Sequence, residues 1–304
     1  SKMCALGKRP ICQDTGIVNI FLEVGMSVQW ESELSLEDMI NEGVRRAYNE
    51  PDNRLRASIV ADPLFSRKNT QDNSPAVIHT KIVKGDTLDI TVAAKGGGSE
   101  NKSKFTVLNP DDSLTDWVLK MIPTMGAGWC PPGMIGIGAG GTAEKAMLMA
   151  KASLMEPIDI NSIKTKANPS DIEKLRIDLF DQINGLGIGA QGLGGLTTVL
   201  DVKINDYPTH AASLPVAMIP NCASTRHVNF SLYGTGVADL PEVDLSLYPD
   251  LEMDVSKYTK VDLNSLTQSQ MNEWNIGDTL LLTGTIITGR DPPHKRLNLM
   301  IERG

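Results

Sequence analysis

The chain has 304 residues, of which 5% are aromatic, and carries a formal net charge of −8. This length allows one large domain or two smaller ones, with a core that needs no disulfides. The acidic balance argues against a nucleic-acid partner, and no apolar run approaches the roughly 20 residues that cross a bilayer. We therefore expect a cytoplasmic protein that binds neither nucleic acid nor a membrane.

The first third of the chain predicts strands and one helix. Residues 17–30 alternate loosely between apolar and polar side chains, which indicates a strand or the arm of a hairpin. Residues 35–48 predict a helix that begins at a serine and carries acidic residues in its first turn. Two apolar runs at 76–83 and 87–94, separated by three residues that include Gly85, predict a β-hairpin.

The middle of the chain predicts three helices followed by two strands. Residues 113–122, 142–155 and 170–182 each begin at a Ser or Thr, which can cap the first turn, and continue with helical periodicity. The apolar runs at 197–204 and 215–219 are typical of strands.

The last quarter is less regular. Residues 235–272 are polar and weakly patterned, which indicates a long surface excursion, and 279–288 predict a buried strand pair or a strand bent at a glycine. Helices and strands mix without a steady βαβ alternation. The predicted fold class is therefore α+β, an irregular α/β arrangement of mixed sheets with flanking helices.

Glycine is more frequent than usual, at 27 of 304 residues against a typical share of ~7%. The glycines cluster at 96–98, 126–141 and 185–195. Glycine permits positive φ and lets backbone N–H groups approach a ligand closely. Tight turns explain any single cluster equally well. Three clusters interleaved with three cysteines favour one anionic site.

Three of the four cysteines lie in loop-prone segments rich in Gly, Pro, Asn and Ser: Cys12, Cys130 and Cys222. Thiolates that hold an iron–sulfur cluster need such segments, because the backbone must bend around the inorganic core. No two cysteines form a CxxC pair, which disfavours a zinc ribbon or a thioredoxin-type motif. The simpler alternative is that two or three of them are buried thiols.

Three cysteine ligands would have a chemical consequence. A [4Fe–4S] cluster with only three protein ligands keeps one iron open, and an open iron can act as a Lewis acid in hydration and dehydration. Cys4 lies eight residues before Cys12 and outside any special motif, so we expect it to be an ordinary thiol.

Five motifs resemble the α-type domain of class I iron–sulfur fumarases (fumarate hydratases) and L-tartrate dehydratases. They are CQDTG, KGGGSENKS, GAGWCPPGMIGIGAGGTAEKA, GIGAQGLGG and HAASLPVAMIPNC, and they extend from residue 12 to residue 222. The motif LTGTIITGRD at 282–291 resembles the opening of the family's β-type domain. The resemblance implies reversible hydration of fumarate to (S)-malate, a place in the tricarboxylic acid cycle, and a homodimer.

The resemblance also implies a set of site residues. The ligands of a [4Fe–4S] cluster with one open iron would be Cys12, Cys130 and Cys222. The substrate-binding residues would be Gln13, Asp14, Arg56, Gly98 and Arg290, and the catalytic residues would be Asp14 and His210. Arginine forks suit the two carboxylates of such a substrate, and histidine can exchange a proton near neutral pH.

Simpler interpretations stand beside these assignments. Arg56 could form a surface ion pair, and the nearby Arg54 could be confused with it. Asp291 could be the ordinary partner of Arg290, and His210 could be a core histidine. The sequence also departs from the family at Val77, where some members have a glutamine that contacts substrate.

The expected domain organisation follows from the same resemblance. Residues 1–234 would form the cluster-carrying catalytic domain, 235–275 a surface linker, and 276–304 the truncated start of a β-type domain. Family members continue into a full β-type domain, which contains the threonine proposed as their catalytic base. We therefore expect this chain to need a β-type domain or subunit, and alone to hold a cluster but hydrate fumarate poorly.

Three alternative functions remain at this stage. A tartrate or mesaconate-type dehydratase would use the same chemistry, but a separate tartrate α subunit would be expected to stop before the TGRD motif. An iron–sulfur sensor or electron-transfer module would need Cys4 as a fourth ligand. A zinc or scaffold domain is disfavoured by the absence of paired cysteine spacing.

Overall fold

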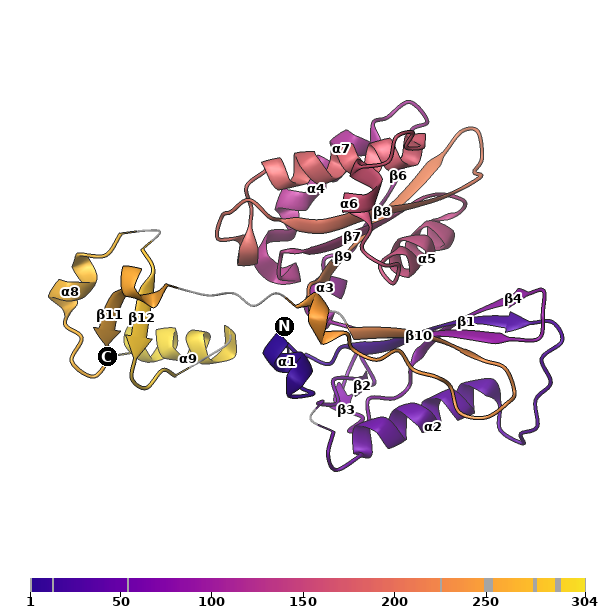
Figure 1. The fold of residues 1–304 in the computed structure, drawn as a ribbon, viewed down its shortest axis with the longest axis horizontal. Helices are drawn as coiled ribbons and strands as arrows, with labels where there is room; N and C mark the ends of the chain where they lie inside the picture. The colour runs from indigo at the N-terminus through magenta and orange to yellow at the C-terminus, as the bar shows by residue number, and fades with distance from the viewer. Residues whose placement is uncertain are drawn as a thin grey trace. The chain divides into compact units, whose positions relative to one another are not determined.

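The computed structural model describes residues 2–12, 14–53, 55–224, 226–248, 254–275, 278–287 and 291–303, with side chains described from residue 294 in the last range. The chain divides into two compact units, Ser1–Leu245 and Ser246–Gly304. Both contain helices and strands, and the two four-stranded sheets of unit 1 mix parallel and antiparallel pairs (Figure 1), so the predicted α+β fold class is confirmed. No described helix has the length and apolar character needed to cross a membrane.

The first sheet of unit 1 has the strand order β10-β5-β1-β4. Its strands are β1 (Ile17–Gly25), β4 (Val77–Val83), β5 (Leu88–Lys95) and β10 (Arg226–Leu232). Side chains alternate along a strand, so Val18, Ile20 and Leu22 of β1 all face one side. There they pack with Val44 of helix α2 (Leu36–Asn49), which covers this face as the lower helix in Figure 1.

The predicted hairpin at 76–94 is wrong in its pairing. Both strands form, but β1 lies between them, parallel to β4 and antiparallel to β5. The connection crosses the end of β1, where Gly25 N donates to Thr87 O and Ser27 N to Gly85 O. A Cβ on Gly25 would lie 2.5 Å from Gly85 O, so the crossing requires glycine there. A turn motif indicates that the chain reverses direction, but it does not indicate whether another strand, here β1, lies between the two strands that it connects.

The second sheet of unit 1 has the order β6-β9-β7-β8. Its strands are β6 (Lys104–Leu108), β7 (Gly133–Gly140), β8 (Val199–Tyr207) and β9 (Leu214–Cys222). One face packs against α4 (Leu114–Met121), η1 (Ile122–Trp129) and α7 (Asp171–Gly185), with Ile135 and Ile137 of β7 fully buried there. Helix α5 (Ala143–Ser153) packs against β7, β8 and β9.

Much of the glycine cluster at 126–141 is strand β7 rather than a ligand-binding loop. Gly136 and Gly138 let helix α5 approach closely. A Cβ on Gly136 would lie 2.2 Å from Ala150 O, and one on Gly138 would lie 2.0 Å from Ala146 O. These two glycines therefore serve helix–strand packing.

Helix α5 also joins the two sheets. Its residues Ala146 and Ala150 belong to one buried cluster with Ala217 of β9 and Ala93 of β5, against which Phe21 of β1 packs. The two sheets of unit 1 therefore share one buried cluster.

The predicted helices and strands of the middle region are confirmed as α4, α5, α7, β8 and β9. Ser113 and Ser170 cap α4 and α7 with their side chains, and Ser170 forms a capping box with Glu173. The sequence did not predict β6, β7, β10 or several short elements. The latter are α1 (Lys2–Leu6), β2 (Val60–Ala61), β3 (Lys68–Asn69), α3 (Gly97–Glu100), α6 (Ile160–Lys164), η2 (Ala190–Gly192) and η3 (Leu245–Leu247).

The second unit contains a parallel pair of short strands. Its elements are η4 (Val255–Lys257), β11 (Thr259–Asp262), α8 (Gln268–Asn272), β12 (Leu280–Thr283) and α9 (Asp291–Glu302). A strand forms within the predicted range 279–288, but β12 has only four residues, and the predicted burial is wrong: Leu280 and Leu281 are partly buried, Leu282 is 47% exposed and Ile287, beyond the strand's end, is 93% exposed. An apolar run alone does not indicate how much of it the rest of the fold covers.

Candidate cysteine site

Strand register brings Cys222 and Cys130 to the same end of the second sheet. Strand β9 ends at Cys222, whose partner on the antiparallel strand β7 is Gly133, the first residue of that strand. Cys130 lies three residues before Gly133 and follows η1 in a left-handed conformation, with φ of 58°. In an antiparallel pair the end of one strand meets the start of the other, so the two cysteine segments are neighbours.

Arg226 holds the third cysteine segment in place. It begins β10, four residues after Cys222, and its guanidinium donates to Cys12 O at 3.0 Å and also to Asp14 O. Cys12 and Cys130 are exposed, whereas Cys222 is partly buried with its Sγ 2.9 Å from Ser224 Oγ.

Asp14 and the glycine run after β5 close the loop around this end. Asp14 Oδ1 accepts from Gly16 N and Oδ2 accepts from Gly97 N, both at 3.0 Å. A Cβ on Gly98 would lie 2.9 Å from Gly128 O, two residues before Cys130. The glycine run 96–98 therefore touches both the Cys12 and the Cys130 segments, and each Asp14 oxygen already accepts a backbone bond.

The segment that carries Arg56 is fastened beside Asp14. Thr15 Oγ1 donates to Arg56 O, and buried Asn73 donates through Nδ2 to Gly16 O at 3.2 Å. Asn73 Oδ1 in turn accepts from Ser58 N at 2.6 Å. The Arg56 side chain is exposed, so it is open to a ligand at this end of the molecule.

His210 lies at the opposite end of the second sheet. It follows Tyr207, the partner of Gly140 at the far end of β7, and its Nδ1 accepts from Ala212 N at 3.1 Å. Strand β7 has eight residues. At a rise of about 3.3 Å per residue, its two ends, Gly133 near the cysteines and Gly140 near His210, are about 23 Å apart. His210 lines a separate cavity of about 700 Å³ there, and the structure does not bring it to the cysteines of its own chain.

Three residues assigned from the sequence, Gln13, Arg54 and Arg290, lie outside the described residues. Cys4 lies on α1, where its carbonyl accepts from Arg9 N at 2.9 Å. Val77 begins β4 and is 41% exposed.

Sequence reasoning missed a buried group of charges next to Cys222. Lys95 ends β5 with its side chain fully buried, donates to Ser99 Oγ at 2.7 Å, and lies 3.5 Å from Glu100 Oε2. Lys151 of α5 contacts the other Glu100 oxygen at 2.5 Å. Burial lowers the pKa of Lys95 to about 8, and Glu100 and Cys222 oppose that shift. The sequence signal that could have identified this group is a lysine, Lys95, at the end of an apolar strand.

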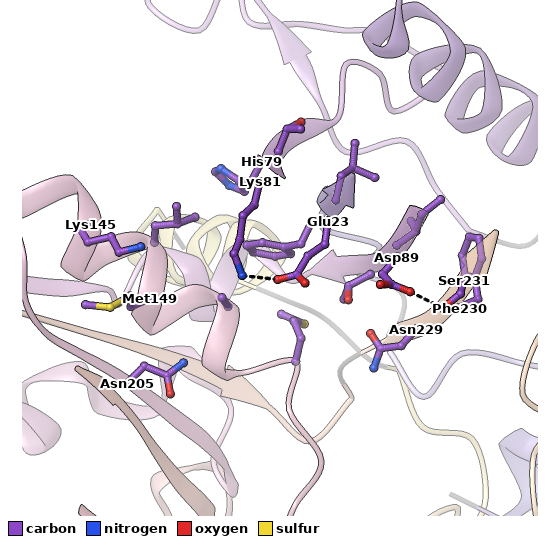
Figure 2. Close-up of a pocket in the computed structure, with 18 residues that line it drawn as sticks. Glu23, His79, Lys81, Asp89, Lys145, Met149, Asn205, Asn229, Phe230 and Ser231 are labelled. Carbon is purple, nitrogen blue, oxygen red and sulfur yellow. Dashed lines mark hydrogen bonds and ion pairs between the residues drawn. The ribbon is translucent and has the colours of Figure 1, made fainter. Parts of the chain in front are cut away.

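A cavity of about 660 Å³ lies between the first sheet and α5 (Figure 2). Its charged groups are already paired in part: Lys81 contacts Glu23 at 2.7 Å, and Ser231 donates to Asp89. His79 stacks on Phe21, and burial lowers its pKa, helped by the Lys151 charge. None of the residues expected at the active site lines this cavity.

The donor set fits a cluster better than a single ion. Among the described residues, no group of three or more His, Cys, Asp or Glu side chains is placed to hold one metal ion. A cubane makes a different demand, because each thiolate binds its own iron. Cys12, Cys130 and Cys222 lie on adjoining segments, with buried Lys95 near Cys222, which is the arrangement that such an anionic group would require.

Two family models match the chain. The model described as fumarate hydratase (Fumerase) matches residues 1–231, and the model described as Fumarase C-terminus matches 234–304. The chain therefore belongs to the fumarate hydratase (Fumerase) family.

Named relatives agree with this family. "Putative L(+)-tartrate dehydratase subunit alpha" of Methanocaldococcus jannaschii is 37% identical over 71% of this chain and 76% of the relative. "Fumarate hydratase class I, anaerobic" of Escherichia coli K12 is 30% identical over 100% of this chain and 57% of the relative. "Fumarate hydratase 2" of Leishmania major is 29% identical over 97% of this chain and 54% of the relative. The chain thus spans little more than half the length of these two fumarate hydratases.

Proposed function

We propose that this chain is the cluster-bearing part of an iron–sulfur hydro-lyase that reversibly hydrates fumarate to (S)-malate. Cys12, Cys130 and Cys222 would hold a [4Fe–4S] cluster with one open iron. The observation that carries the proposal is the meeting of three cysteine segments, far apart in sequence, at one end of unit 1.

The cluster would supply a Lewis acid, and the chain's own residues would position the substrate. Arg56, exposed beside the Asp14 loop, would bind one carboxylate with its planar fork of donors. The N–H of Gly98 would add a donor that cannot titrate. Asp14 would orient substrate through the lone pairs left after its two backbone bonds. Arg290 would bind the second carboxylate, and Gln13 would lie beside the first.

The source of the proton is a separate part of the proposal. His210 lies about 23 Å from the cysteine end by strand geometry, so we do not assign it a catalytic role in its own chain. Asp14 remains the candidate within unit 1, and a β-type domain or subunit would supply the principal base. Homodimer formation and a cytoplasmic location complete the proposal.

Fumarate is the preferred substrate, with tartrate the second candidate. The match to the fumarase C-terminus model and the coverage of the whole chain by the E. coli fumarate hydratase support fumarate. The higher identity to the M. jannaschii relative supports tartrate. The two substrates share the carboxylates that Arg56 and Arg290 would bind, so these residues do not distinguish them.

The test is anaerobic reconstitution of the purified chain with iron and sulfide, both alone and together with the β-type domain of a relative. Iron and sulfide are counted, and turnover is measured on fumarate, tartrate and mesaconate. Replacing Cys12, Cys130 or Cys222 with Ser should abolish cluster absorbance and activity together. Cys4→Ser is the matched control and should preserve both. Loss of the cluster in Cys4→Ser, with retention in one of the other three, would contradict the ligand set.

A further inference from the structure

Lys95, Glu100 and Lys151 form a buried group that we call the Lys95 cluster. The Lys95 side chain is fully buried, and those of Glu100 and Lys151 are 27% and 17% exposed. Glu100 lies between the two lysines, 3.5 Å from Lys95 Nζ and 2.5 Å from Lys151 Nζ. Two positive charges thus share one carboxylate, and the cluster carries one net positive charge.

A second charged network in unit 1, in which Asp159 is 44% exposed and the other three side chains are buried, is arranged differently. Arg176 and Lys203 contact both Asp159 and Asp201, at distances between 2.5 and 3.2 Å. Here two cations meet two carboxylates, so the network is neutral. Burying a charge without a partner is strongly unfavourable, whereas in a balanced network the ion pairs largely compensate for the loss of water. The Lys95 cluster therefore has an unbalanced positive charge that the second network lacks.

The excess charge of the Lys95 cluster faces the cysteine end. Helix α3, which carries Glu100, packs against β9, the strand that ends at Cys222. An ionised Cys222 is close enough to favour the ammonium form of Lys95. On the other side, the Lys102 side chain fills the space beside Gly128, near Cys130. An anionic group between Cys222 and Cys130 would balance these charges.

The proposed cluster has the required sign. A [4Fe–4S]²⁺ core with three thiolates leaves one net negative charge. We propose that the Lys95 cluster is the buried counter-charge of the iron–sulfur cluster, with Lys95 as a positioning residue that favours the reduced, more negative state. This inference rests on the proposed function and assigns Lys95, Glu100 and Lys151 a role in setting the reduction potential.

Two substitutions test the charge directly, because they change it in opposite directions. Lys95→Met leaves the neutral Glu100–Lys151 pair and removes the net positive charge. Glu100→Gln raises the net charge by one. We expect Lys95→Met to lower the reduction potential of the reconstituted cluster and Glu100→Gln to raise it. Each shift should be about tenfold in the ratio of reduced to oxidised cluster, or 59 mV for one electron. Potentials are measured by anaerobic redox titration followed by electron paramagnetic resonance.

Lys203→Met is the matched control, because Lys203 is an equally buried lysine in the neutral network. Its removal leaves a carboxylate uncompensated, so it should lower the unfolding temperature of the apo chain strongly and shift the potential little. Lys95→Met should show the reverse pattern. If Lys95→Met does not fold, Lys151→Met removes the same charge from a more exposed position and should lower the potential by a smaller factor.

The outcomes separate the two proposals. A wild-type chain that takes up no iron and sulfide overturns the proposed function and this inference with it. A chain that holds a cluster whose potential is unchanged in the variants overturns this inference alone. Shifts of the same sign for Lys95→Met and Glu100→Gln would also overturn it, because a merely structural disturbance has no reason to follow charge.

Discussion

At the residue scale, the sequence identified the candidate cysteines but not the residues that hold their segments in place. Cys12, Cys130 and Cys222 each lie in a segment whose Gly, Pro, Asn or Ser residues indicate a bent backbone. Arg226 lies only four residues after Cys222, yet its partners Cys12 and Asp14 are more than 200 residues away. The burial of Lys95 likewise depends on helices α3 and α5, so no local pattern reveals it.

Arg226→Ala should loosen the Cys12 segment without unfolding unit 1. Two charge-assisted hydrogen bonds to backbone carbonyls are lost, and such bonds contribute roughly 1.5–3 kcal/mol each. Loss of both bonds should release iron to a chelator at least about a hundredfold faster, measured by absorbance under anaerobic conditions. Arg46→Ala, which removes an exposed ion pair with Glu42 on α2, is the control and should leave the release rate unchanged. Equal rates in both variants would show that Cys12 does not depend on Arg226.

At the element scale, periodicity predicted the four longest α-helices of unit 1, whereas the glycine-rich strand β7 and the pairing order of the first sheet were missed. Ser35, Ser113 and Ser170 cap α2, α4 and α7 with their side chains, and Thr142 precedes α5 without a side-chain capping bond. Caps and helical periodicity act within a few residues, so the sequence reveals them. Four of the eight residues of β7 are glycine, so its sequence resembles a loop, and the close approach of α5 to Gly136 and Gly138 and of neighbouring strands to Gly133 and Gly140 explains the composition. The order of strands in the first sheet depends on long-range pairing that a turn motif does not encode.

Gly138→Ala should destabilise unit 1 because its Cβ would lie 2.0 Å from Ala146 O, a backbone atom of α5 that cannot move without shifting the helix. Overpacking of this kind costs about 1–3 kcal/mol or more, and the measurement is urea denaturation of the apo chain. Gly43→Ala is the matched control: Gly43 lies within α2 with open space around its Cα. Alanine there should stabilise the chain by up to ~1 kcal/mol. Equal effects of the two substitutions would contradict the packing role of β7.

At the scale of the whole molecule, the candidate cluster site belongs to unit 1. The three cysteines, Arg226 and the Lys95 cluster all precede residue 246, and so do the residues of the three buried cores. Arg290 belongs to the second unit and lies outside the described residues. The family resemblance implies the same division: the cysteine ligands lie in the α-type region, and Arg290, which would bind the second carboxylate, lies after it.

Residues 1–245 alone should therefore fold cooperatively and take up as much iron and sulfide as the 304-residue chain. Each of the three cores is complete within this range, so removal of 246–304 exposes no part of them to unfolding. Fumarate hydration should be lost even when the remainder of a relative's β-type domain, without the part that matches 246–304, is supplied, because Arg290 is removed with the second unit and a carboxylate loses its fork. Thermal unfolding, iron counting and cluster absorbance test the first part, and an anaerobic malate-to-fumarate assay tests the second. Cys222→Ser in the same shortened chain is the control and should take up no cluster. A shortened chain that folds but binds less iron would place a ligand or an essential support of the cluster within 246–304.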